Sequence, residues 1–260
     1  MANHLRFRKR RFEADEIRDG DGYELSGGVP IQCQPTGGRG SDAAATGAAV
    51  LKSDPKVDAA GVETGYSPRP DTLRAPDIAV GNVPREPGWV KGVPPLAVEY
   101  ADTGQDEKDL RVKLRELLDA GTRFVWVVRL TGPRRVEVHA PDSDMRTLHP
   151  GDTLEAPGIL ENPVPVEALY DWQVGQQITL RNLLQRQGYG SLDAVRAEGA
   201  AESELETLRT SILDVFAERG LLVDEAVRAE LEACQDPGTL RRWLRRAITV
   251  ERAHDLLADD

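Results

Sequence analysis

Two short apolar runs that each carry one carboxylate constrain this chain more than any other feature. Residues 76–80 read Pro-Asp-Ile-Ala-Val, and residues 96–100 read Leu-Ala-Val-Glu-Tyr. Each run has the length of a buried strand. A buried strand normally carries no ionised group, because removing a carboxylate from water is unfavourable unless a charge meets it. Asp77 and Glu99 are therefore predicted to meet a common cation.

The residues that follow predict the core of an α/β protein. Leucines recur at i, i+4 and i+7 between residues 106 and 119, which predicts a helix that Gly121 ends. An apolar run at 124–130 is typical of a central strand, and 135–140 alternates as its antiparallel neighbour would. The order strand, helix, strand, strand predicts a mixed central β-sheet flanked by helices.

The residue types at these positions favour metal-dependent cleavage of a phosphodiester. Two carboxylates suit a hard cation such as Mg²⁺ or Mn²⁺, which prefers oxygen ligands. Lys113 on the following helix can meet a phosphate, and Asp109 lies one turn before it. Simpler interpretations also exist: Asp77 as a turn former, Glu99 facing solvent, Lys113 as a solvated helix residue, and Asp109 as its ion-pair partner.

Several of these elements together resemble one known family. Tyr23-Glu24-Leu25 ahead of glycines, Pro76-Asp77, Val98-Glu99, and Asp109 with Lys113 before Gly121 and residues 125–128 are similar to the Uma-two family of putative restriction endonucleases. That family belongs to the PD-(D/E)XK nuclease superfamily, and the resemblance spans residues 19–170. It implies a restriction-endonuclease-like fold and a DNA-cutting homodimer.

The resemblance also implies roles for individual residues. Asp77 and Glu99 would bind Mg²⁺ or Mn²⁺, aided by the backbone carbonyl after Glu99, while Glu24 and Asp109 would be accessory acids. The usual spacing puts a lysine at position 101, where this chain has alanine, so the resemblance implies a migrated lysine, Lys113. A serine and a histidine often found in the family are absent. The alternative is a catalytically inactive nuclease fold that acts as a binding or regulatory module.

Composition excludes several other classes of protein. The net charge of −11 argues against non-specific coating of nucleic acid, which rests on neutralising phosphates. Cys33 and Cys234 have no spacing that suggests a disulfide framework or a zinc site. No apolar run approaches the roughly 20 residues that span a bilayer. The basic start is not followed by an apolar stretch, so it is no secretory signal, and a cytoplasmic location is expected.

Four segments are predicted along the chain. Residues 1–18 form a basic arm, 19–172 the nuclease-like domain, 173–200 a linker, and 201–260 a small all-helical C-terminal module. From Ser191 to Asp260 there are 16 Asp and Glu against 9 Arg and no Lys. This acidic module could dock a partner protein.

Overall fold

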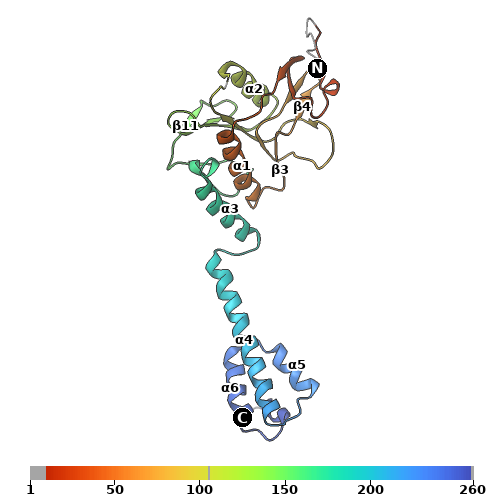
Figure 1. Ribbon diagram of the computed structural model, residues 1–260, viewed down its shortest axis with the longest axis vertical. Helices are drawn as coiled ribbons and strands as arrows, with labels where there is room; N and C mark the ends of the chain where they lie inside the picture. The colour runs from red at the N-terminus through yellow and green to blue at the C-terminus, as the bar shows by residue number, and fades with distance from the viewer. Residues whose placement is uncertain (1–9, 105, 259–260) are drawn as a thin grey trace. The chain divides into compact units, whose positions relative to one another are not determined.

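The computed structural model describes residues 10–104 and 106–258, and the chain divides into two compact units, Met1–Gly188 and Tyr189–Asp260 (Figure 1). The strands described here all lie in the first unit. No helix in the described part of the chain is long and apolar enough to cross a membrane.

The first unit is a mixed α/β fold built on two sheets, as the sequence predicts. The six-stranded sheet has the order β11-β10-β9-β8-β6-β3, and the five-stranded sheet has the order β2-β1-β5-β4-β7. β8 and β9 are parallel, with α2 as the crossover between them, whereas β6 pairs antiparallel with β8. The strands are β1 Tyr23–Ser26, β2 Val29–Gln32, β3 Ala60–Val62, β4 Tyr66–Arg69, β5 Thr72–Arg74, β6 Ile78–Val80, β7 Val90–Lys91, β8 Leu96–Ala101, β9 Phe124–Arg129, β10 Arg135–His139, β11 Arg146–Leu148, and the small pair β12 Thr153–Leu154 and β13 Val164–Pro165.

Helices cover both faces of the six-stranded sheet. Helix α1, Gly38–Ser53, packs on the face that carries Ile78, Val98 and Trp126. Helix α2, Glu107–Asp119, packs its predicted leucine stripe on the opposite face. The leucines of the helix and the strand residues that they contact form one buried cluster: Leu110, Leu114, Leu117, Ala97, Ala101, Val125 and Val127. Because side chains alternate along a strand, Glu99 lies between Ala97 and Ala101 on the α2 face. The two small alanines leave room for α2 to approach there.

Helix α1 starts at Gly38, with Gly37 as an N-cap that offers no side chain. Small residues along the helix permit close approach to the sheet. A β-carbon at Gly47 would overlap the hydroxyl of Tyr100, which donates a hydrogen bond of 2.8 Å to the carbonyl of Leu169.

We therefore expect Gly47→Ala to destabilise the chain, although alanine is the better helix former. Overpacking a core costs about 1–3 kcal/mol, which outweighs the roughly 1 kcal/mol gained in helix propensity. Gly199→Ala is the matched control, since nothing lies within 4 Å of a β-carbon built there in helix α4. Denaturant unfolding should show opposite signs for the two variants. A stabilised Gly47→Ala chain would contradict the packing described.

The segment 173–200, expected as a linker, is mostly helical. Helix α3, Trp172–Arg186, is capped by Asp171 and packs beside α1 (Figure 1). Val174 and Ile178 pack against the core, and polar contacts add to them: Asn182 donates to the hydroxyl of Ser53 at 3.1 Å, and Arg186 donates to the carbonyl of Ser53 at 2.9 Å. Apolar residues also lie on the exposed side of the helix, so the sequence shows no single apolar stripe that would predict it.

The basic arm predicted for residues 1–18 lies partly outside the described residues, which begin at Arg10. From there the chain packs against the hairpin of β1 and β2. The Phe12 N–H donates to the carbonyl of Gly28 at 2.9 Å, and the 3₁₀ turn η1, Ala14–Glu16, buries Ala14. This part of the predicted arm therefore belongs to the packed unit.

The second unit is all-helical, as predicted, and has its own apolar core. Helix α4, Leu192–Glu218, starts before the expected boundary at residue 201. Helices α5, Glu225–Ala233, and α6, Pro237–Ala247, follow, with Asp224 and Asp236 as their N-caps. The fully or nearly fully buried residues of this core are Ile212, Phe216, Val227, Leu231, Leu240, Ala247, Ala253 and Leu256. A docking role for this unit stays a prediction.

Candidate active site

Strand register brings Asp77 and Glu99 together. Ile78 of β6 lies opposite Val98 of β8, so the next residues along, Asp77 and Glu99, are cross-strand neighbours. The main-chain N–H of Tyr100 donates to Oδ2 of Asp77 at 2.5 Å, which ties the end of β6 to β8. Pairing of the antiparallel strands β6 and β8 thus brings together two acids that are twenty-two positions apart in the sequence.

Lys113 reaches the same place from helix α2. Its Nζ donates to the carbonyl of Ala75 at 2.7 Å and to Oε2 of Glu99 at 3.0 Å. Oε1 of Glu24 is also 3.0 Å from Nζ. The ammonium group therefore contacts oxygens of three residues.

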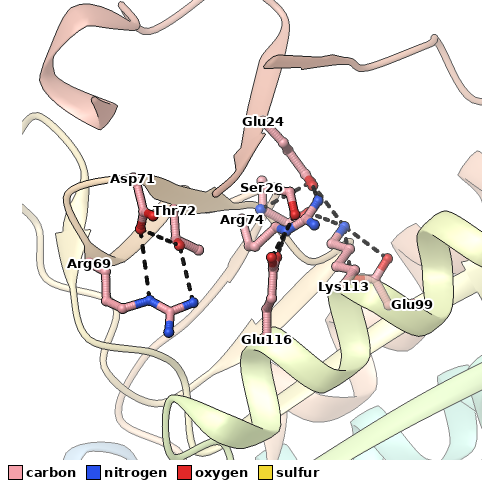
Figure 2. A network of polar contacts seen from close by, with 10 residues as sticks. Glu24, Ser26, Arg69, Asp71, Thr72, Arg74, Glu99, Lys113 and Glu116 are labelled. Carbon is pink, nitrogen blue, oxygen red and sulfur yellow. Dashed lines mark hydrogen bonds and ion pairs between the residues drawn. The ribbon is translucent and has the colours of Figure 1, made fainter. Parts of the chain in front are cut away.

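A second set of polar residues adjoins this group (Figure 2). Arg74 of β5, which is 2% exposed, donates from Nη1 to Oε2 of Glu24 at 2.8 Å and from Nε to Oε2 of Glu116 at 2.5 Å. The hydroxyl of Ser26 donates to Oε1 of Glu116 at 2.6 Å. Lys113 and Glu116 lie one turn apart on α2, so one helix face serves both halves of the network.

The pKa values of the three acids differ because their partners differ. Burial raises the pKa of Glu99 to about 8, since the pull of Lys113 does not offset desolvation and the neighbouring charges of Asp77 and Glu24. Burial also raises the pKa of Asp77, against the opposing effects of Lys113 and the Tyr100 N–H. For Glu24 burial acts in the same direction, but Lys113 and Arg74 outweigh it and hold the pKa below its ordinary value.

Lys113 is held in its charged form. Burial alone would lower the pKa of its ammonium group, but the carboxylates of Glu99, Glu24 and Asp77 outweigh that effect and raise it. A buried lysine that stays protonated is suited to donate hydrogen bonds and to stabilise negative charge.

The charges and atoms present fit a divalent cation beside Asp77 and Glu99. Four carboxyl groups share this region with two cationic side chains, so full ionisation of the carboxyl groups gives an excess of two negative charges; the six residues are Glu24, Asp77, Glu99, Glu116, Arg74 and Lys113. Oε1 of Glu99 is buried and, although 2.9 Å from Nζ of Lys113, forms no hydrogen bond of acceptable geometry. Carboxylate oxygens are the donors that Mg²⁺ prefers.

The side chains would not complete such a site alone. Across residues 10–104 and 106–258, no three His, Cys, Asp or Glu side chains converge in a way that would hold a metal ion. Main-chain carbonyl oxygens or water must supply the remaining ligands, and Mg²⁺ usually keeps several waters.

The residues singled out from the sequence do not all meet. Asp77, Glu99, Lys113 and Glu24 come together, whereas Asp109 is exposed in the first turn of α2, where its N–H donates to the capping carboxylate of Asp106. The lysine thus contacts strand carboxylates, not a helix neighbour. Sequence reasoning missed Arg74, although its position three residues before Asp77 in an apolar segment was a signal.

Comparison with solved structures identifies the fold. The chain is similar to a putative nuclease belonging to DUF820 from Anabaena variabilis, with a TM-score of 0.53 and 19% sequence identity, over 62% of this chain and 98% of that one. No curated protein matches the sequence. The first unit thus has a nuclease fold with an acidic, lysine-containing site on one sheet face.

A family assignment follows from the sequence itself. Residues 10–167 match the model of the Uma2 family, whose members are described as putative restriction endonucleases. The chain belongs to this family, which confirms the resemblance found in the sequence. The matched region ends before α3, so the second unit lies outside it.

Proposed function

We propose that this chain is a divalent-metal-dependent endonuclease that hydrolyses phosphodiester bonds in DNA. One observation carries the proposal: Asp77 and Glu99 are cross-strand neighbours, and the ammonium group of Lys113 is 3.0 Å from Glu99. Asp77 and Glu99 would hold Mg²⁺ or Mn²⁺ together with the main-chain carbonyl that follows Glu99.

The chemistry divides between the cation and the protein. A bound divalent cation supplies a water of lowered pKa and stabilises the charge that builds on the phosphate. Lys113 donates a hydrogen bond to a phosphate oxygen or to the attacking water, and its raised pKa keeps it a donor. The α2 face of β8 is walled by leucines of α2, so these polar groups act where water is partly excluded.

The substrate, assembly and location follow from the proposed reaction. A DNA substrate agrees with the family description of restriction endonucleases. A homodimer would bring two copies of the site to the two strands of a duplex. We also place the protein in the cytoplasm.

Plasmid cleavage tests the proposal. Wild-type protein with Mg²⁺ or Mn²⁺ should convert supercoiled plasmid to nicked and then linear DNA, and a chelator or the substitution Asp77→Asn should stop it. Nicking that persists unchanged in Asp77→Asn would assign the activity to a contaminant. Duplex binding without cleavage under any metal would favour the non-catalytic binding module. A matched RNA duplex, run in parallel, separates DNA from RNA as substrate.

A further inference from the structure

Glu24 differs from the other two acids in how completely its carboxylate is used. Oε1 accepts a hydrogen bond from the N–H of Ala75 at 3.1 Å and lies 3.0 Å from Nζ of Lys113. Oε2 accepts from Nη1 of Arg74 at 2.8 Å. Each oxygen of Glu24 therefore accepts a hydrogen bond, whereas Oε1 of Glu99 is 2.9 Å from Nζ of Lys113 but accepts no hydrogen bond.

The partner of Glu24 is itself fixed on its other side. Arg74 is 2% exposed and spans from Glu24 to Glu116, which in turn accepts from Ser26. Ser26 and Glu24 share strand β1, and Lys113 and Glu116 share helix α2. The contacts form a closed ring in which each charged group is held from two sides (Figure 2).

We propose that Glu24 is a positioning residue for Lys113, held in place by Arg74 and Glu116, and that it does not bind the divalent cation. The cluster then has two parts: Asp77 and Glu99 bind the cation, and the ring of Glu24, Arg74, Glu116 and Ser26 fixes the lysine. This inference rests on the proposed function, because only a metal-dependent reaction gives the division a purpose.

Physical reasons favour this division. A cation that approached Glu24 would have to displace Arg74 or Lys113, and like charges in a buried region repel strongly. Among the contacts of Lys113, the one to Glu99 can be exchanged for a contact to substrate, because the carbonyl of Ala75 and the carboxylate of Glu24 still hold the ammonium group.

Positioning of this kind matters for rate. A displacement of about 1 Å in a reacting or stabilising group can reduce the rate roughly 10²-fold. A flexible lysine side chain needs external contacts to stay within that tolerance, since its four-carbon stem rotates freely. The ring supplies these contacts without using the carboxylates that the cation needs.

Two measurements on the full-length chain test the inference without cleavage. The first is Mn²⁺ affinity, from the electron paramagnetic resonance signal of free Mn²⁺. Glu24→Gln should change the Kd by less than about threefold, whereas Glu99→Gln should weaken it at least about thirtyfold, equivalent to roughly 2 kcal/mol. Equal losses in the two variants would make Glu24 a metal ligand and overturn the inference.

The second measurement is acetylation of lysines, read by mass spectrometry of peptides. The chain has six lysines, and the exposed Lys108 on the same helix is the internal standard. Acetylation of Lys113 relative to Lys108 should rise about tenfold in Glu24→Gln, because the variant loses the ion pair between Glu24 and Lys113. An unchanged ratio would show that Glu24 does not hold the lysine.

A milder variant guards against misfolding. Ser26→Ala removes only the hydroxyl that supports Glu116, and it should raise Lys113 acetylation in the same direction, by a smaller factor, with Mn²⁺ affinity unchanged. If wild-type protein bound no Mn²⁺, the proposed function would fail, while the acetylation ratio would still decide whether the ring holds the lysine.

Discussion

Glu99→Gln is expected to lower the rate of DNA cleavage about 10³-fold and, in metal-free protein, to raise thermal stability at alkaline pH. The two effects have one cause. The carboxylate is buried, 6% exposed, with more negative than positive charge around it. Its ionised form is therefore stabilised by a bound cation and destabilises the folded chain when no cation is bound. Glutamine keeps the shape and removes the charge.

The sign of the pH effect follows from linkage. The pKa of Glu99 is raised from 4.5 to about 8 in the folded chain, so the folded state binds the proton more tightly than the unfolded state does. The stability that this proton contributes is fully present below pH 4.5 and is lost as the pH rises through about 8. Glutamine does not ionise, so Glu99→Gln is not destabilised in this way. In the presence of a chelator, the melting temperature of Glu99→Gln should therefore exceed that of wild type above pH 8.

A matched control isolates the position. Glu137 is also a buried strand glutamate, 8% exposed, but it is paired with Arg129 at 2.8 Å and lies on β10 outside the cluster. Glu137→Gln should leave cleavage unchanged. A Glu99→Gln chain that cut DNA at the wild-type rate would remove Glu99 from the site.

Lys113→Met is expected to have the second largest effect, on stability as well as activity. The ammonium group is the cation nearest to Glu99, and it also contacts Glu24 and the carbonyl of Ala75. Removing one partner of a buried ion pair costs about 3–5 kcal/mol, because the remaining charge stays without compensation. Cleavage should fall by on the order of 10²-fold through loss of electrostatic stabilisation.

A divalent cation should partly restore the stability of this variant. With Lys113 gone, the acids have a larger charge excess, so Mn²⁺ should raise the melting temperature of Lys113→Met more than that of wild type, as binding to the native state stabilises it. Lys108→Met is the control, because Lys108 is an exposed residue on the same helix. This variant should have the same melting temperature as wild type. If Mn²⁺ raised the melting temperatures of Lys113→Met and wild type equally, the cation would bind away from Lys113.

The juxtaposition of Asp77, Glu99 and Lys113 could be predicted because it depends on local patterns. Each acid lies in a short apolar run, so both were placed on buried strands, and the leucine stripe of α2 fixed which face of that helix meets the sheet. The intervening helix and the strand at 124–130 gave the order of elements. Whether these residues perform the proposed roles stays a prediction that the experiments above address.

The ring around Arg74 could not be predicted, since it depends on contacts between distant positions. Arg74 contacts Glu24 across 50 residues and Glu116 across 42, and Ser26 reaches Glu116 across 90. Sequence periodicity gives no information on contacts between such distant residues, and an arginine is far more often exposed than buried. Only the packing of β1, β5 and α2 reveals that these side chains share one buried volume.

Apolar periodicity did not predict helix α3 or the first half of helix α4, for a different reason. Helix α3 packs Val174 and Ile178 against the core, but its exposed side carries Trp172, Leu180 and Leu183, so its apolar residues do not form a single stripe. The first half of α4 is rich in alanine and glutamate and mostly exposed, which gives helix propensity but no stripe. Helix propensity without an apolar stripe is therefore the reason that residues 173–200 read as a linker in the sequence.

The most direct test of the account is the position of Mn²⁺ in crystals of the full-length protein, read from anomalous scattering. We predict a peak that both Asp77 and Glu99 coordinate, with Glu24 still bound to Arg74 and Lys113. A peak on Glu24, or one only among the acidic residues of the second unit while cleavage still requires Mn²⁺, would contradict the account.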